Sequence, residues 1–389
     1  MYFPTFSLFL QQNMKIVVDD KIPYIRETLA LLADEVVYKK GADISADDVR
    51  DADALIVRTR TRCDERLLRG SRVQFVATAT IGYDHIDTQW LEANGIAWTN
   101  CPGCNAGSVA QYVESVLLNL RSSRSTLHAP LTTLGVVGCG HVGSKVCRVG
   151  ERLGMRVLVN DPPLINANVN ANVNANVNAN VNVNAQRSTL HPQRSTLNAP
   201  LSTLNAPLST LNAPFVPLET IAREADVITF HVPLDDTTHY LADEAFFRQL
   251  KRKPVIINSS RGGVVNEQAL LWAMDEGLVS GAVIDTWEHE PDIARTLLYR
   301  VLIGTPHIAG YSADGKVNAD NMVVEALCRH FSLPQPPKIV APQLPHDFVY
   351  SGNPLELYNV MSDSEKLKAH PEKFEELRGN YPLRREIFD

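Results

Sequence analysis

Two stretches, Leu134-Gly-Val-Val-Gly-Cys-Gly-His-Val-Gly143 and Val157-Leu-Val-Asn-Asp161, decide the fold of this chain. The first is an apolar strand that runs into three glycines, whose spacing lets the backbone approach a pyrophosphate at the N-terminus of the next helix. Asp161 ends a second apolar strand, where a carboxylate can bind an adenosine ribose and repel a 2′-phosphate. A glycine pattern alone also occurs in tight turns. Strand, helix and terminal acid in this order predict a dinucleotide site.

The bulk composition predicts a multidomain soluble protein. The chain has 389 residues, of which 44% are hydrophobic and 21% are charged, enough for two or three cores. A net charge of −7 with scattered Lys and Arg argues against nucleic-acid binding. No apolar run is long enough to span a bilayer, so no membrane association is expected.

The six cysteines are too few for a disulfide scaffold, which together with the lack of a secretory leader favours the cytoplasm. Cys101-Pro-Gly-Cys104 resembles half of a redox or zinc site. A second Cys pair or His pair that would complete a metal shell is missing, so we interpret this motif as a turn before a helix. No metal is predicted.

Residues 14–100 alternate short apolar strands with helical patterns, which is typical of a parallel sheet covered by helices on both faces. The strands are expected at KIVVDD, EVVY, ALIVR, VQFVATAT and IAWTN, with a helix over residues 23–33. Residues 1–13 lack the charge and cleavage pattern of a signal peptide. We interpret them as a disordered extension or an upstream-start artefact, with Met14 as the true start.

Residues 101–305 are expected to form the dinucleotide-binding domain. Asn105 or Ser108 can cap its first helix, and four more strands follow the two quoted above. Low-complexity repeats at 165–214 interrupt it, and they lack the apolar surface needed to offset ordering. Disorder is the main expectation; because Asn-Ala-Asn-Val alternates with period two, a strand or aggregating segment is the alternative.

After about residue 330 the sequence becomes a proline-rich linker and a short charged segment, 331–389. This segment is too small to hold a large core alone, so we expect it to pack on another subunit.

Three polar residues stand just beyond the ends of predicted strands in the dinucleotide domain: Arg261, Glu290 and His307. Ligands of open α/β sheets lie beyond the carboxyl ends of the strands, so these side chains are placed to converge. Arg261 can clamp a carboxylate, His307 can exchange a proton near neutral pH, and Glu290 can stabilise the imidazolium. Each residue alone is more often a surface or structural group; the combination favours catalysis.

The chain resembles the D-isomer-specific 2-hydroxyacid dehydrogenase family over most of residues 14–330, apart from the repeats. The motifs that carry the resemblance are the glycine loop with Asp161, His231-Val-Pro233, Asn258-Ser-Ser-Arg-Gly-Gly263, Asp285-Thr-Trp-Glu-His-Glu-Pro291 and Pro306-His-Ile-Ala-Gly310. More specific cues, such as Leu377-Arg-Gly-Asn-Tyr-Pro-Leu-Arg-Arg-Glu386, resemble the branch that oxidises 4-phospho-D-erythronate.

The resemblance implies two doubly wound parallel-sheet domains. They are a flavodoxin-like substrate domain (14–100, completed by about 306–330) and a Rossmann NAD domain (101–305). A small C-terminal region, 331–389, would form a homodimer. The catalytic residues would be Arg261, Glu290 and His307. The NAD site would be lined by Gly138, Gly140, His141, Val142, Gly143, Asp161, Val232, Asp285 and Gly310. Substrate would contact Thr59, Thr80 and Tyr311. Apart from the resemblance, Arg58 ends the predicted ALIVR strand and is the better-placed candidate to bind the substrate phosphate, whereas Arg60 and Arg62 beyond it can equally form a solvated edge.

The implied activity is NAD-dependent oxidation of 4-phospho-D-erythronate to 3-hydroxy-2-oxo-4-phosphobutanoate, a step of pyridoxal 5′-phosphate biosynthesis. Another hydroxyacid dehydrogenase, acting on phosphoglycerate or an unphosphorylated acid, is one alternative. A catalytically silent protein that senses NAD is another. The repeats, the 13-residue leader and the short C-terminal region depart from the family pattern. A further possibility is that the repeats prevent folding and the chain is the product of a decaying gene.

Overall fold

The computed structural model describes residues 13–122, 130–165 and 213–386. The chain divides into two compact units: the first contains Met1–Asn105 and Ser312–Phe348, and the second contains Ala106–Tyr311 and Val349–Asp389. The predicted N-terminal extension up to residue 12 and residues 166–212 of the repeats lie outside the described residues. No helix in the described ranges is long and apolar enough to cross a membrane.

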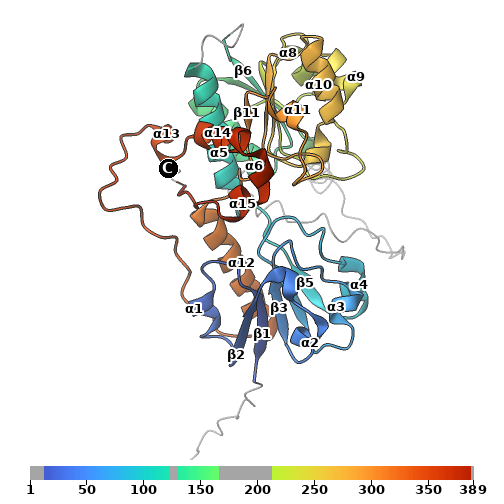
Figure 1. Cartoon of the computed structure of the whole chain (residues 1–389), viewed down its shortest axis with the longest axis vertical. Coiled ribbons are helices and arrows are strands. Elements are labelled where there is room, and N and C mark those ends of the chain that lie inside the picture. Colours follow the sequence, from blue (N-terminus) through green and yellow to red (C-terminus); the bar gives the residue numbers. More distant parts are fainter. Residues whose placement is uncertain (1–12, 123–129, 166–212, 387–389) are drawn as a thin grey trace, which may run out of the picture. The chain divides into compact units, whose positions relative to one another are not determined.

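The first unit is built on a five-stranded parallel sheet in the order β2-β1-β3-β4-β5, the flavodoxin order (Figure 1). Its strands are β1 Lys15–Asp19, β2 Glu35–Lys39, β3 Ala54–Val57, β4 Phe75–Thr78 and β5 Ala97–Thr99. Its helices are α1 Arg26–Leu29, α2 Ala46–Val49, α3 Glu65–Leu68, α4 Thr88–Ala93 and α12 Ala313–Phe331, with a 3₁₀ turn at Gly41–Asp43.

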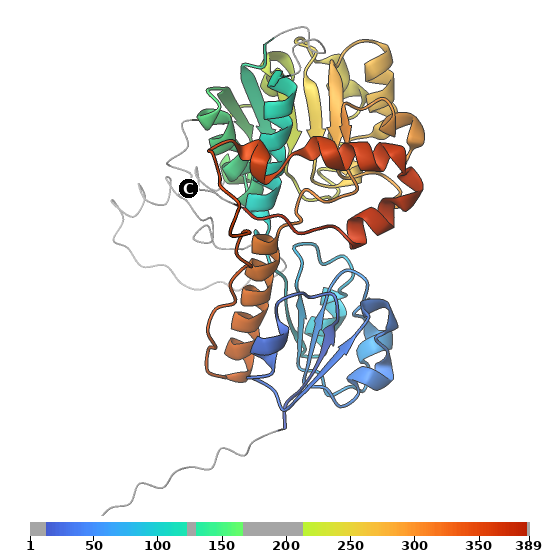
Figure 2. The same cartoon turned by 60° about the vertical axis from the view of Figure 1, so that its left-hand side comes forward.

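Both faces of this sheet are buried, which explains its continuous apolar strands. Ile16 and Val18 of β1 face one core together with Val323 and Leu327 of α12, a helix that lies along the sheet in Figure 2. Val17 faces the opposite core, which α2, α3 and α4 cover. The strand periodicity of two therefore distributes each strand between two layers of helices.

The second unit holds a six-stranded parallel sheet in the order β11-β10-β9-β8-β6-β7. A single parallel bridge between Val159 and Phe215 extends it beyond β7, as in a dinucleotide fold. The strands are β6 Thr133–Val137, β7 Arg156–Asn160, β8 Val227–Phe230, β9 Val255–Asn258, β10 Gly281–Ile284 and β11 Ile303–Gly304. The two parallel-sheet domains confirm the predicted fold class.

The helices of the second unit come from both of its chain segments. They are α5 Ala106–Ser122, α6 His141–Arg152, α8 Leu218–Glu224, α9 Glu244–Arg248, α10 Glu267–Asp275, α11 Arg295–Leu298, α13 Pro354–Leu357, α14 Val360–Ala369 and α15 Phe374–Gly379, with 3₁₀ turns at Gly262–Val264 and Pro371–Lys373.

The C-terminal residues 349–386 pack on the second unit of their own chain (Figure 2). Val360 joins the core of α5 and α6, whereas Leu367 and Phe374 join the core on the other side of the sheet. These contacts within the same chain were not predicted, because the segment was expected to pack on another subunit. Its role in pairing two chains stays a prediction.

Two predicted local features are wrong. Of the two predicted caps of α5, Asn105 directly precedes the helix, but its buried Oδ1 has no hydrogen-bond partner. Ser108 lies inside the helix, fully buried, and its hydroxyl donates to the carbonyl of Ala309. The helix expected over 23–33 is reduced to α1, Arg26–Leu29, and the Tyr24 amide before it donates to Asp320 of α12.

The Cys101–Cys104 turn is confirmed: turn residues lead directly into α5, and both thiols are buried and not joined in a disulfide. Burial raises the pKa of Cys101, and its thiol donates to the carbonyls of Thr78 and Ala319. Among the described residues no cluster of His, Cys, Asp and Glu is arranged to hold a metal.

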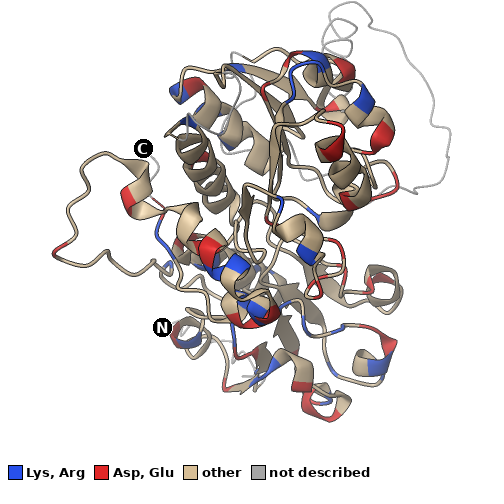
Figure 3. Cartoon of the chain, turned by 45° about the horizontal axis from the view of Figure 1, so that its top comes forward, with Lys and Arg blue, Asp and Glu red and all other residues tan. Residues whose placement is uncertain are grey.

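The end of the repeat segment belongs to the sheet. Ala213 is buried, and the carbonyl of Pro214 accepts a hydrogen bond from the Val159 amide at 3.0 Å. The predicted boundary at residue 214 is therefore too late. Elsewhere, acidic and basic residues are interspersed over the described chain, and both signs occur together on the longer helices α5, α6 and α12 (Figure 3).

Candidate active site

The three glycines between β6 and α6 have different surroundings. Gly138 adopts φ 88°, and a Cβ there would lie 2.6 Å from the His231 carbonyl oxygen. A Cβ on Gly143 would collide with the carbonyl oxygen of Gly138. A Cβ added to Gly140, which precedes α6, would have no neighbouring atom within 4 Å. The loop thus packs tightly on the protein side and is open at the helix N-terminus, which fits a bound pyrophosphate.

His141, Val142 and Val232 support this loop. Val142 packs against the core beneath α6, and Val232 approaches Gly138 so closely that a Cβ there would lie 2.8 Å from it. Burial, with the charge of Lys145, lowers the pKa of His141. The neutral form of His141 at the N-terminus of α6 is thereby favoured.

Asp161 follows β7 and is fixed beside the glycine loop. One carboxylate oxygen accepts from the Cys139 amide at 2.7 Å, and the other accepts from the Leu164 amide at 3.1 Å. The acid is thereby held at the neighbouring strand end, and Pro162 and Pro163 follow it. This placement fits recognition of a ribose diol.

His307 and Glu290 form the chemical centre of the second unit. The Nδ1 of His307 donates to Glu290 Oε2 at 2.8 Å and lies 3.1 Å from Oε1, while the Trp287 amide donates to Oε1 at 2.9 Å. Their side chains are 26% and 17% exposed. Burial raises the pKa of Glu290, but the bond and charge of His307 together with the Trp287 amide outweigh it, and the pKa is lowered. A charged carboxylate therefore orients the imidazole, leaving Nε2 for proton exchange.

Asp285 holds the loop that carries His307. Its carboxylate is buried and accepts from the Thr305 hydroxyl at 2.6 Å and from the amides of Ile308 and Ala309 at 2.8 and 2.9 Å. His307 itself has φ 56°, which a non-glycine residue adopts only when its surroundings impose it. The observed partners of Asp285 are in this loop, so its predicted contact with NAD stays a prediction.

Arg261 follows β9, the strand beside β10, while Glu290 and His307 follow β10 and β11. Its guanidinium donates to the Ser260 carbonyl at 2.8 Å. The next residue, Gly262, packs so closely on the Trp287 carbonyl that a Cβ would collide with it. The backbone of the Arg261 loop thus lies against the loop of Glu290, and the convergence of the Arg261 side chain on the pair stays a prediction.

The predicted substrate contacts are divided between the units. In the first unit, Arg58 Nη1 donates to the Lys21 carbonyl at 3.3 Å, and its buried Nε has no hydrogen-bond partner. Thr59 is exposed, and the Thr80 hydroxyl donates to the Gly82 carbonyl at 2.8 Å. Tyr311, three residues after Ile308, belongs to the second unit with Gly310. Their convergence stays a prediction.

Two residues that reach this centre were not predicted. Arg378 Nη1 lies 3.6 Å from Glu290 Oε2, and Arg384 binds the chain that follows His307. The terminal motif quoted above contains both arginines, but a role for them requires the tertiary fold.

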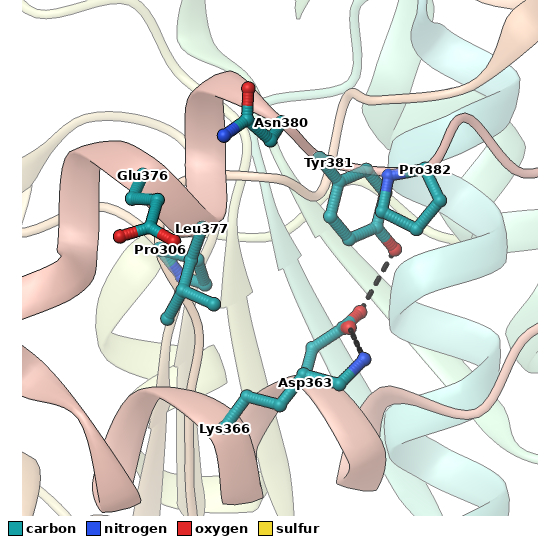
Figure 4. Close-up of a pocket in the computed structure, with 8 residues that line it drawn as sticks. All are labelled: Pro306, Asp363, Lys366, Glu376, Leu377, Asn380, Tyr381 and Pro382. Carbon is teal, nitrogen blue, oxygen red and sulfur yellow. Dashed lines mark hydrogen bonds and ion pairs between the residues drawn. The ribbon is translucent and has the colours of Figure 1, made fainter.

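A cavity of about 150 Å³ is lined in part by Pro306, the residue before His307 (Figure 4). Acidic and basic groups share its wall: Lys366 Nζ is 3.8 Å from Asp363, which also accepts from the Tyr381 hydroxyl at 2.9 Å. The lining is Pro306, Asp363, Lys366, Glu376, Leu377, Asn380, Tyr381 and Pro382. Most of it comes from the C-terminal segment rather than from the predicted site.

Comparison with known proteins agrees with this geometry. Residues 197–309 match the model of the D-isomer specific 2-hydroxyacid dehydrogenase NAD binding domain. The erythronate-4-phosphate dehydrogenase of Bacteroides thetaiotaomicron is 48% identical over 96% of this chain and 97% of its own length. That of Porphyromonas gingivalis is 36% identical over 96% of this chain and 94% of its own.

Solved structures share the fold at lower identity. D-lactate dehydrogenase from Aquifex aeolicus, complexed with NAD and lactic acid, is 22% identical with a TM-score of 0.58 and covers 82% of this chain and 95% of its own. Apo D-lactate dehydrogenase from Escherichia coli is 19% identical with a TM-score of 0.61 and covers 83% and 99%. The chain belongs to the D-isomer-specific 2-hydroxyacid dehydrogenase family.

Proposed function

We propose that this chain oxidises the C2 hydroxyl of 4-phospho-D-erythronate with NAD, giving 3-hydroxy-2-oxo-4-phosphobutanoate. The observation that carries the proposal is 48% identity over 96% of the chain to an enzyme named for this substrate. The hydrogen-bonded His307–Glu290 pair supports the chemistry. The step belongs to pyridoxal 5′-phosphate biosynthesis, and we place the protein in the cytoplasm as a homodimer.

In this reaction His307 acts as the base. Oxidation removes a hydride from C2 and a proton from its hydroxyl, and Nε2 of His307 accepts that proton. Glu290 stabilises the imidazolium that results, because its charged carboxylate is 2.8 Å from Nδ1. Asp285 keeps the loop in the conformation that presents the imidazole. Arg261 holds the substrate carboxylate through paired hydrogen bonds.

The residues of the glycine loop fit the cofactor. Gly138, Gly140 and Gly143 would hold the pyrophosphate of NAD against α6, and Asp161 would bind the adenosine ribose. The other proposed NAD contacts are His141, Val142, Val232, Asp285 and Gly310. When bound, NAD supplies the hydride acceptor for the reaction. The carboxylate of Asp161 disfavours a 2′-phosphate by charge repulsion, so NAD is preferred to NADP.

The phosphate of the substrate requires a cation, and we assign Arg58 to it. Its Nε is buried without a hydrogen-bond partner, and it stands at the carboxyl end of β3, where ligands of open sheets bind. Thr59, Thr80 and Tyr311 are the other proposed substrate contacts.

A substrate panel tests this function. NADH formation is followed with 4-phospho-D-erythronate, 3-phosphoglycerate, unphosphorylated erythronate and D-lactate, each at a fixed NAD concentration. We expect the highest kcat/KM with 4-phospho-D-erythronate. A higher value for another acid would assign the chain to a different dehydrogenase of the family, and NAD binding without turnover of any acid would indicate a sensor.

A further inference from the structure

The C-terminal segment 374–386 carries two arginines that contact the loops of the His307–Glu290 pair. Arg378 lies on α15, and Arg384 lies in the extended chain that follows it. Both belong to the same unit as the pair, together with Tyr311. The segment therefore reaches the proposed catalytic centre within one compact body.

Arg384 anchors this segment. It is 8% exposed, and its guanidinium donates to the carbonyls of Ile308, Ala309 and Tyr311 at 3.1, 2.6 and 3.0 Å. Its Nε donates to Gln111 of α5 at 2.9 Å, and the group stacks on the ring of Tyr358 at 4.0 Å. These bonds fix the C-terminal chain directly on the loop that begins with His307.

Arg378 is placed where its charge acts on the pair. Its Nη1 is 3.6 Å from Glu290 Oε2 and 3.9 Å from Glu375 Oε1, and the Tyr311 side chain is close enough to raise the pKa of the guanidinium. The side chain is 22% exposed, so solvent only partly screens these interactions. Arg378 thus lies between Glu290, whose carboxylate orients His307, and Tyr311, a proposed substrate contact.

We propose that Arg378 is a positioning residue of the dehydrogenase reaction, which tunes the proton affinity of the His307–Glu290 pair and holds the Tyr311 hydroxyl. The inference rests on the proposed function, because it concerns the proton that the reaction removes from substrate. Arg378 acts through Glu290 and Tyr311 rather than on the reacting atoms.

The sign of the effect follows from the surrounding charges. Asp285 is hydrogen-bonded to the His307 loop, and Glu267 and Glu288 lie near Glu290; each of these carboxylates, when ionised, favours a bound proton on the pair. Burial raises the pKa of Glu267 to about 7, so this group titrates in the same range. Arg378 opposes these acids. Removing its charge lets the pair retain its proton to a higher pH, and oxidation requires the unprotonated pair.

The test is the pH profile of kcat/KM for 4-phospho-D-erythronate in wild type, Arg378→Gln and Arg378→Lys. Arg300→Gln is the matched control, since it removes an arginine that pairs with Asp275 on the surface of the same unit. We expect Arg378→Gln to move the acid limb to higher pH by about 0.5 to 1 unit, which lowers the rate at a fixed pH on that limb by about 3- to 10-fold. Arg378→Lys keeps the positive charge, so its acid limb should lie close to the wild-type pH.

Melting curves and NADH binding by fluorescence accompany each variant, so that a folding defect is recognised. If Arg378→Gln does not fold, Arg378→Lys still tests the proposed contact with Tyr311 through an increased KM for substrate. Acid limbs that superimpose in all folded variants, with an unchanged KM, would overturn the inference. Absence of turnover in wild type would instead refute the proposed function.

Discussion

Replacing Glu290 by glutamine removes one negative charge from beside His307 while keeping a side chain of nearly the same size. The amide oxygen can still accept from the Trp287 amide, but the amide nitrogen then faces Nδ1 of His307, where the carboxylate accepted at 2.8 Å. The substitution therefore tests the charge and the tautomer rather than the packing of the loop.

The expected magnitude follows from the partial exposure of the pair. Unit charges about 4 Å apart interact by roughly 4 kcal/mol at an effective dielectric of about 20, and solvent at the exposed part of the pair reduces this value. A hydrogen bond to a charged group contributes about 1.5 to 3 kcal/mol. Because about 1.4 kcal/mol corresponds to a factor of ten, Glu290→Gln should lower kcat/KM roughly 10- to 100-fold.

The assay is NADH formation with 4-phospho-D-erythronate over a range of pH. Without the carboxylate the imidazolium is less stable, so His307 is free to act as a base at lower pH and the acid limb moves down. This direction is opposite to that expected for Arg378→Gln. Glu372→Gln is the control, because it breaks an exposed His370–Glu372 pair with an Nδ1–Oε1 distance of 3.3 Å. A Glu290→Gln enzyme with an unmoved acid limb and near-wild-type efficiency would refute this reasoning.

Three further predictions concern cofactor, repeats and substrate phosphate. Wild type should use NAD with higher kcat/KM than NADP, and Asp161→Ala should reduce that preference; equal efficiencies in wild type would contradict the role of the carboxylate. A variant that joins Ile165 to Ala213 through a few glycines should keep its melting temperature and activity, because loop costs grow only logarithmically. Insoluble protein would show that the repeats are structural. Arg58→Ala should lower the efficiency on phosphoerythronate about 10- to 100-fold and leave that on erythronate nearly unchanged. An equal loss with both substrates would place the phosphate elsewhere.

The arrangement of both sheets could be predicted from the order of strands and glycines. Buried parallel strands such as β3 and β4 read as continuous apolar runs, and the residues after β9, β10 and β11 stand at one edge of the sheet. Local sequence patterns were enough to predict the strands, because a strand buried on both faces is apolar along its whole length. The resemblance to known motifs then supplied roles for Arg261, Glu290 and His307.

Contacts between distant parts of the chain could not be predicted in this way. The Tyr24 amide, just before α1, donates to Asp320 of α12, and the hydroxyl of Ser108 donates to the carbonyl of Ala309 instead of capping a helix. Arg378 and Arg384 act on loops that are about 70 to 90 residues away in sequence. Their side chains in a charged terminal segment look like solvated surface groups until the fold brings them to the buried loops.

Hydride transfer from C2 of 4-phospho-D-erythronate to NAD is the central claim, and isotope labelling tests it most directly. The wild-type enzyme is incubated with substrate carrying deuterium at C2, and both products are analysed by mass spectrometry. The account predicts NADH that carries one deuterium and 3-hydroxy-2-oxo-4-phosphobutanoate without it, with His307→Asn slower by about 100-fold or more. Unlabelled NADH, or no NADH from this substrate, would contradict it.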